Sequence, residues 1–271
     1  MMHKRTLHSL LIVSFIVAFA ASMSFATNDV NIESKSNLLR CTNQGLNVTL
    51  NLDQNVSAVE CVFVVTNAGA FVNTLGITWQ LPAGVLSDRV VDLTRANGTA
   101  PDTIRFAAMR TGETDGVLTA GQAKAFAQIT FKLGDFCSGS ANFAGGEWAF
   151  PHPTEPIVTQ FVDAATYAII YPMIVAGSAG IANQTPTISA IADQTIGWGD
   201  PLTVPLSGGD GDLANGCETL TFDVGPGAPA GADVVGTNFV WTPSGDQVCI
   251  NTVPIVVTDK CGATATTSFD V

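Results

Sequence analysis

Two aspartates, Asp210 and Asp212, stand one residue apart in the glycine-rich stretch GGDGDLANGCETLTF at residues 208–222. Carboxylates placed this closely can supply the oxygen ligands that Ca²⁺ takes in proteins. Asp259, which follows a later strand pattern, and the carbonyl of Asn183 would add two further oxygens. Aspartate and glycine are also the residues that favour tight turns, with their carboxylates facing water. The stretch therefore predicts either a structural calcium site or a simple turn, and the sequence leaves both open.

Six cysteines could form disulfides, and they divide equally between the two halves of the chain: Cys41, Cys61, Cys137, Cys217, Cys249 and Cys261. No C-x-x-C pair occurs, so the usual zinc patterns are absent. Cys217 follows the acidic turn and Cys261 follows Asp259. A bridge between these two cysteines would tie the turn to the last hairpin and would stabilise the fold by about 4 kcal/mol. We expect this pairing.

The pairing of Cys41, Cys61, Cys137 and Cys249 stays open. Unless a bridge crosses between the halves, each half keeps one odd cysteine.

Tryptophan rings could stack on sugars, and Trp79 and Trp148 are the candidates in the first half of the chain. Packing inside a core is the alternative role for such rings.

Catalysis has weaker support, because His152 is the only histidine after residue 8 and stands between two prolines. A Ser-His-Asp system would depend entirely on that residue. We expect a protein that is not an enzyme and needs no cofactor other than calcium.

Residues 1–26 have the three parts of a secretory signal peptide: basic residues at Lys4 and Arg5, an apolar stretch at 10–21, and small residues before position 27. The apolar stretch is too short to span a bilayer, which takes roughly 20 residues. The sequence therefore predicts export to the cell surface or the extracellular space. Disulfides persist in such oxidising compartments.

The charge balance is strongly acidic, with 23 acidic against 11 basic residues, and cleavage after residue 26 would remove two of the basic ones. Such a polyanion repels phosphate backbones, so we expect no nucleic-acid partner. Divalent cations are plausible ligands.

Apolar and polar residues alternate along much of the chain, for example at 46–53 and 127–133, and turn-forming residues separate these segments. Regular short strands of this kind are typical of β-sandwiches. The run TYAIIYPMIVAG at 166–177 contains Pro172 and is too short to span a membrane, so we expect a closing strand and no transmembrane segment.

The fold class predicted is all-β, with two sandwich domains after the signal peptide. We expect a lead-in at 27–44, a first sandwich at 45–176, a linker at 177–186 and a second sandwich at 187–271.

Several short pieces of the second half occur in a characteristic order: Asn183-x-x-Pro186, IADQTI at 191–196, GDGD at 209–212, LTFDV at 220–224, PAGADV at 229–234, FVWTPS at 239–244 and VVTDKCGA at 256–263. In this order they resemble the Ig-like, dystroglycan-type cadherin-like repeats of bacterial surface proteins. The resemblance favours the calcium interpretation. The glutamate usual after the second piece is replaced by Trp198-Gly199-Asp200, so one ligand is lost there unless Asp200 substitutes for it.

The first half contains LNVTLNLDQNVSAVECVFVVT at 46–66, LPAGV at 81–85, IRFAAM at 104–109 and LTAGQAKAFAQITFKL at 118–133. These patterns look like a cohesin-type domain, the sandwich shared with certain carbohydrate-binding modules. The resemblance implies that edge strands and loops of the first domain bind a protein partner, with the second domain as a spacer. The alternative is polysaccharide recognition, alone or as the accessory part of a degradative assembly.

Overall fold

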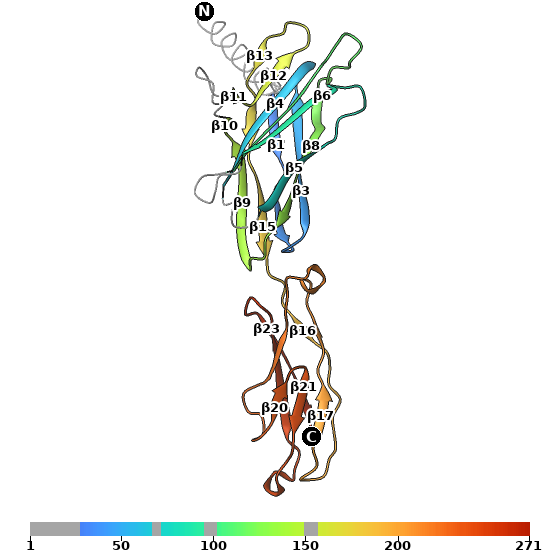
Figure 1. The fold of residues 1–271 in the computed structure, drawn as a ribbon, viewed down its shortest axis with the longest axis vertical. Coiled ribbons are helices and arrows are strands. Elements are labelled where there is room, and N and C mark those ends of the chain that lie inside the picture. The colour runs from blue at the N-terminus through green and yellow to red at the C-terminus, as the bar shows by residue number, and fades with distance from the viewer. Residues whose placement is uncertain (1–27, 67–71, 95–101, 149–156) are drawn as a thin grey trace, which may run out of the picture.

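The computed structural model describes residues 28–66, 72–94, 102–148 and 157–271, so the expected signal peptide lies outside the described residues. The chain forms two β-sandwich domains that follow one another along the long axis of the molecule (Figure 1). The all-β fold class predicted from the sequence is confirmed.

The first domain packs two sheets face to face. One sheet has the strand order β14-β1-β3-β8-β5. Its strands are β1 (Asp29–Ile32), β3 (Asn43–Leu52), β5 (Val72–Trp79), β8 (Gly121–Leu133) and β14 (Met173–Val175). The other has the order β13-β12-β4-β9-β15-β2, and β7 pairs with both β4 and β6. Its strands are β2 (Lys35–Leu38), β4 (Val56–Thr66), β6 (Asp88–Thr94), β7 (Asp102–Met109), β9 (Ser138–Gly145), β12 (Gln160–Asp163), β13 (Ile169–Ile170) and β15 (Gly177–Ala182). The short strands β10 (Glu147–Trp148) and β11 (Ile157–Val158) pair with each other.

Alternation explains why these residues form strands with one buried face. In β3, Leu46, Val48, Leu50 and Leu52 are buried, and the residues between them are only partly buried. Successive side chains of a strand point to opposite faces, so one apolar residue in two is enough to line a core. Phenylalanines from β4, β7 and β8 fill the space between the sheets.

The second domain is smaller and has its own core. One sheet joins β17 (Leu202–Pro205), β21 (Asn238–Trp241) and β20 (Asp233–Val235), and another joins β19 (Thr221–Val224), β22 (Thr252–Thr258) and β23 (Thr264–Asp270). A two-stranded piece joins β16 (Thr187–Ile188) and β18 (Gly208–Gly209). Two 3₁₀ turns, η1 (Leu213–Asn215) and η2 (Gly245–Gln247), complete it. Phe239, Trp241, Ile255 and Phe269 are buried between its sheets.

Two of the expected boundaries are wrong. The segment 27–44, expected as a lead-in, contains β1, β2 and the start of β3. The first part of the expected linker is β15, which pairs antiparallel with β9 and parallel with β2. Its glycines and alanines suggested flexibility, but Ala179 and Ile181 are buried in the first core. The connection between the domains is therefore short, at residues 183–186.

The run at 166–177 forms two separate edge strands, β13 and β14, with Pro172 between them. Proline lacks the backbone N–H that continued pairing needs, so the chain leaves one sheet there and joins the other. Among the described residues, no helix has the length and apolar character needed to cross a bilayer.

Candidate functional site

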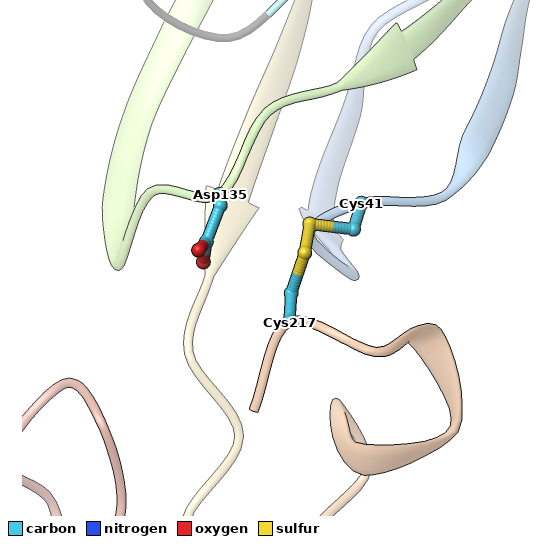
Figure 2. Close-up of side chains that lie close together, drawn as sticks. All are labelled: Cys41, Asp135 and Cys217. Carbon is cyan, nitrogen blue, oxygen red and sulfur yellow. A yellow bond between two sulfur atoms is a disulfide. The ribbon is translucent and has the colours of Figure 1, made fainter. Parts of the chain in front are cut away.

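Two disulfides cross from one domain to the other. Cys41 pairs with Cys217, with their Cα atoms 6.3 Å apart, and Cys137 pairs with Cys261 at a Cα separation of 5.5 Å. Figure 2 shows the first bridge, with Asp135 beside it. The predicted Cys217–Cys261 bridge is therefore wrong.

The physical reason lies in the loops that face the junction. Cys41 lies in the turn between β2 and β3, and Cys137 lies in the turn between β8 and β9. Cys217 and Cys261 lie in loops of the second domain that face them. Each cysteine of the second domain bonds to a cysteine of the first domain. The prediction considered only cysteines of the second domain and therefore paired Cys217 with Cys261.

Cys61 and Cys249 are the free cysteines of the described residues. Burial, and secondarily the negative charge of Glu60, raise the pKa of the Cys61 thiol well above its ordinary value. Cys249 is an exposed residue of the second domain.

Arg40 of the first domain extends into the second domain and is fully buried. Its guanidinium forms an ion pair with Glu218, and its Nε lies 3.5 Å from Oδ2 of Asp212. Its Nη1 donates to Sγ of Cys261 at 2.9 Å. A buried charge is tolerated when it is paired and hydrogen-bonded, and here both carboxylates come from the other domain.

A second ion pair crosses the junction, from Lys260 of the second domain to Asp135 of the first. Asp135 also lies 3.5 Å from Nη1 of Arg40. We call the two disulfides and these ion pairs the interdomain clamp; its residues are Arg40, Cys41, Asp135, Cys137, Asp212, Cys217, Glu218, Lys260 and Cys261. The clamp restricts rotation of one domain against the other.

The acidic turn adjoins this clamp. The backbone N–H of Asp212 donates to Oδ1 of Asp210 at 2.7 Å, and the N–H of Gln184 donates to Oδ2 of Asp212 at 3.2 Å. The Asn183 amide donates to Oδ2 of Asp259 at 2.5 Å, and Oδ1 of Asp259 accepts from the N–H of Ala263 at 2.8 Å. The four residues predicted as calcium ligands thus lie in the connection and in two loops of the second domain next to the clamp, in two hydrogen-bonded pairs.

Three of the carboxylates are arranged in a way that fits a cation with oxygen ligands. Asp210, Asp212 and Glu218 bring one oxygen each within 4.8 Å of one another. Buried oxygens without a hydrogen-bond donor include Oδ2 of Asp210, Oδ1 of Asp212 and Oδ1 of Asn183. Arg40 pairs with two of these three carboxylates, Asp212 and Glu218, so negative charge remains in excess. A divalent cation would satisfy both the free oxygens and this charge.

Glu218 was not among the residues predicted as ligands, and Asp259, which was predicted, is not a member of this group. Glu218 stands six residues after Asp212, outside the turn, and its contact with Arg40 has no signal in the sequence. A second group of possible ligands, Cys41, Asp135 and Cys217, cannot offer thiolates because both sulfurs belong to a disulfide.

The two tryptophans predicted to stack on sugars lie in the first domain. Trp79 is partly buried, with its ring edge-on to Phe106 and Phe126 at centroid distances of 6.0 and 5.5 Å. The Arg89 guanidinium lies 5.6 Å from the centroid of the same ring. These contacts favour the packing role for Trp79. Trp148 lies in β10, its side chain is outside the described part, and sugar stacking on it stays a prediction.

An exposed apolar surface follows β13 and β14, which we call the β13–β14 strip. Its members alternate along the chain and are exposed by 71, 56, 68, 59 and 42%: Tyr167, Ile169, Tyr171, Met173 and Val175. The alternation of apolar residues is visible in the sequence, but the sequence does not indicate which face of these strands the rest of the protein covers.

A tight turn positions the first member of the strip. The Asp163 carboxylate accepts from the N–H groups of Ala165 and Thr166 and from the Thr166 hydroxyl, and Tyr167 adopts a positive φ of 58°. The Thr166 hydroxyl, then the neighbouring backbone amides, hold the pKa of Asp163 below its ordinary value.

No family model matches the chain, and no curated protein is similar to it. Among solved structures, a chain from a crystal structure of a CaDoc0917–CaCohA2 complex is similar with 11% identity and a TM-score of 0.43, covering 58% of this chain and 100% of that one. The C-terminal domain of the Streptococcus agalactiae AgI/II polypeptide BspA is similar with 9% identity and a TM-score of 0.34, covering 90% and 99%. A second structure of the BspA C-terminal region has 8% identity and the same TM-score. The fold assignment rests on the strands and sheets described above.

Proposed function

We propose that the protein is an extracellular, non-catalytic interaction module. Its first domain binds a protein partner through the β13–β14 strip, and its second domain acts as a spacer held by the interdomain clamp. The observation that carries this proposal is the strip itself.

The strip has the chemistry of a recognition surface. Five apolar side chains that alternate along residues 167–175 face water on a strongly acidic protein, and exposed apolar surface of this kind marks interaction sites in soluble proteins. Both tyrosines of the chain belong to it. Tyrosine is enriched at interfaces because its ring is apolar and its hydroxyl stays hydrogen-bonded.

The strands beneath the strip also suit recognition. β13 and β14 are each the last strand of a sheet, so each has one edge that no strand of the described chain pairs with. An extended segment of a partner could align beside them while its side chains contact the strip.

The test is site-specific crosslinking. A photoreactive phenylalanine analogue at position 171 should capture a protein partner, whereas the same analogue at Val235, exposed by 60% on the second domain, should not. With the captured partner purified, Ile169→Ser with Met173→Ser should weaken binding at least about tenfold, the effect of losing roughly 1.4 kcal/mol of contact. Unchanged affinity in this double variant would exclude the strip as the binding surface.

The alternative function is polysaccharide binding, which the exposed rings of Tyr167 and Tyr171 favour. Stacking on sugars needs the aromatic rings and is insensitive to the aliphatic neighbours. In polysaccharide pull-downs, loss on Tyr167→Ala with Tyr171→Ala, and retention on Ile169→Ser with Met173→Ser, would support this function over protein binding. Trp148→Ala tests the predicted tryptophan in the same assay.

We also propose that the acidic turn binds Ca²⁺ through Asp210, Asp212 and Glu218, with Asn183 and Asp259 holding the turn in place. The unsatisfied oxygens described above support this. A bound ion stabilises the folded state according to its concentration and affinity. Thermal unfolding should therefore shift upward with millimolar calcium after EDTA treatment, and Asp210→Asn should abolish the shift while Asp223→Asn should not. A melting temperature that calcium leaves unchanged in the wild type would end this proposal.

A further inference from the structure

A groove of about 440 Å³ lies in the second domain, away from the clamp. Its lining includes Ile196, Trp198, Trp241, Val248, Ile250 and Asp270. β23 begins after the loop that carries Cys261 and ends at Asp270, so the groove lies at the far end of this strand, where Figure 1 marks the C-terminal end of the chain.

The groove presents large apolar side chains to water. Trp198, Val248 and Ile250 are exposed by 70, 67 and 78%. The buried core residue Trp241 forms part of the lining, so the groove is continuous with the core of the domain.

Hydrogen bonds hold the loops around the groove. The N–H of Gly199 donates to the carbonyl of Pro243 at 2.8 Å, which ties the loop of Trp198 to the opposite loop. The Asn251 amide donates to the carbonyls of Gln247 and Cys249 at 2.9 and 2.8 Å. The groove is therefore formed before any ligand arrives, and binding would order few groups.

The electrostatic environment of the groove is acidic. Asp193 and Asp270 line it. Asp246 belongs to η2 beside Gln247, and the Ser244 hydroxyl holds the pKa of Asp246 below its ordinary value. Lys260 is the only basic residue after position 187, and it lies in the clamp at the other end of the domain. No cation of the second domain neutralises these carboxylates.

The polar groups of the lining are mainly hydrogen-bond acceptors. The amide groups of Gln194, Gln247 and Asn251 all donate to backbone carbonyls of their own domain. These amide donors are already engaged, whereas carboxylate oxygens and apolar surface stay available to a ligand that brings cations and apolar groups. A second copy of this acidic chain is disfavoured, because like charges would meet there.

We propose that this groove binds a basic peptide segment of a partner protein in which lysine or arginine alternates with apolar residues. The apolar side chains occupy the groove between Trp198 and Ile250, and the cations pair with the surrounding aspartates. Trp198 can also contact a cation through its ring face. This site is separate from the β13–β14 strip, so the second domain is a binding domain as well as a spacer.

The probe is a short synthetic peptide of alternating lysine and leucine, tested on the full protein. Two comparison peptides have serine in place of leucine, or glutamate in place of lysine. We expect measurable binding of the lysine–leucine peptide alone, weakening as salt is raised because exposed charge pairs are screened. Trp198→Ala should weaken it about 30-fold, as for truncation of an aromatic anchor.

Cys249 reports occupancy independently, because it lines the groove and is exposed. The lysine–leucine peptide should slow alkylation of Cys249 by a maleimide, and the serine peptide should not. Asp223→Asn, an exposed charge change on β19, serves as the matched control and should leave binding unchanged.

Any of three results would overturn the proposal. The serine peptide could bind as tightly as the lysine–leucine peptide, or Asp223→Asn could weaken binding as much as Trp198→Ala. The third result is a rate of Cys249 alkylation that the lysine–leucine peptide leaves unchanged. Each of these outcomes would mean that the peptide attaches to the acidic surface in general. None of them bears on the β13–β14 strip.

Discussion

At the scale of single residues, Arg40 neutralises negative charge that is buried at the junction between the domains. Its guanidinium is the only cation that contacts Asp212 and Glu218 among the described ion pairs, and all three side chains are fully buried. Removing one member of a buried pair leaves an uncompensated charge, which costs roughly 3–5 kcal/mol.

We therefore expect Arg40→Met to lower the free energy of unfolding by about 3–5 kcal/mol in urea titrations with the disulfides intact. Arg110→Met, which removes contacts to two loop carbonyls at an exposed site, should cost no more than about 0.5 kcal/mol. Similar losses in the two variants would show that the junction pair contributes little.

The two free cysteines should differ sharply in reactivity. The thiolate is the reactive species, and burial disfavours it at Cys61 by raising the pKa. In the folded protein, iodoacetamide at neutral pH should modify Cys249 alone, and Cys61 should react only after denaturation. Peptide mass mapping checks this result, and modification of native Cys61 would contradict the buried core of β4.

At the scale of elements, the turn between β12 and β13 depends on the ionised form of Asp163. Because its pKa is lowered in the folded state, this group stabilises the fold above its unfolded pKa of about 3.9 and loses that contribution as the pH falls through the lower folded value.

We expect Asp163→Asn to lower the melting temperature at pH 7 and to reduce the further fall seen on acidification below about pH 4. Calorimetry across this pH range checks both effects. Asp88→Asn, at the exposed start of β6, is the matched control. If the melting temperatures of the wild type and of Asp163→Asn changed with pH in parallel, the ionised carboxylate would have no role in stability.

At the scale of the whole molecule, the clamp makes one elongated body from two domains (Figure 1). The bridges join residues separated by 176 and 124 positions. Closing a loop of that size in the unfolded chain removes entropy equivalent to about 5 kcal/mol in the loop-closure model. The β13–β14 strip and the acidic groove are then held near opposite ends.

Replacing all four bridging cysteines by serine should loosen the junction. Small-angle X-ray scattering should show a broader distribution of molecular lengths than in the wild type, and the melting temperature should fall. Variants that lose only Cys41 and Cys217, or only Cys137 and Cys261, should stay extended because one bridge and the ion pairs remain. A quadruple variant that scatters like the wild type would show that the short connection and the ion pairs orient the domains without the bridges.

The sequence by itself determined the all-β class and the location of the acidic turn. A strand with one buried face has an apolar residue at every second position, as at Leu46 and Val48. This pattern involves only residues that are close together in the chain, so it can be recognised in the sequence. Turn formation at Asp210 is equally local.

Only the tertiary structure decided that Cys217 bonds to Cys41, that Arg40 meets Glu218, and that β15 belongs to the first sandwich. The partners in these contacts are far apart in the chain and follow no period. Arg40 and Cys41 meet their partners where the two sandwiches adjoin, and β15 pairs with β9 inside the first sandwich, so no local pattern could indicate these contacts.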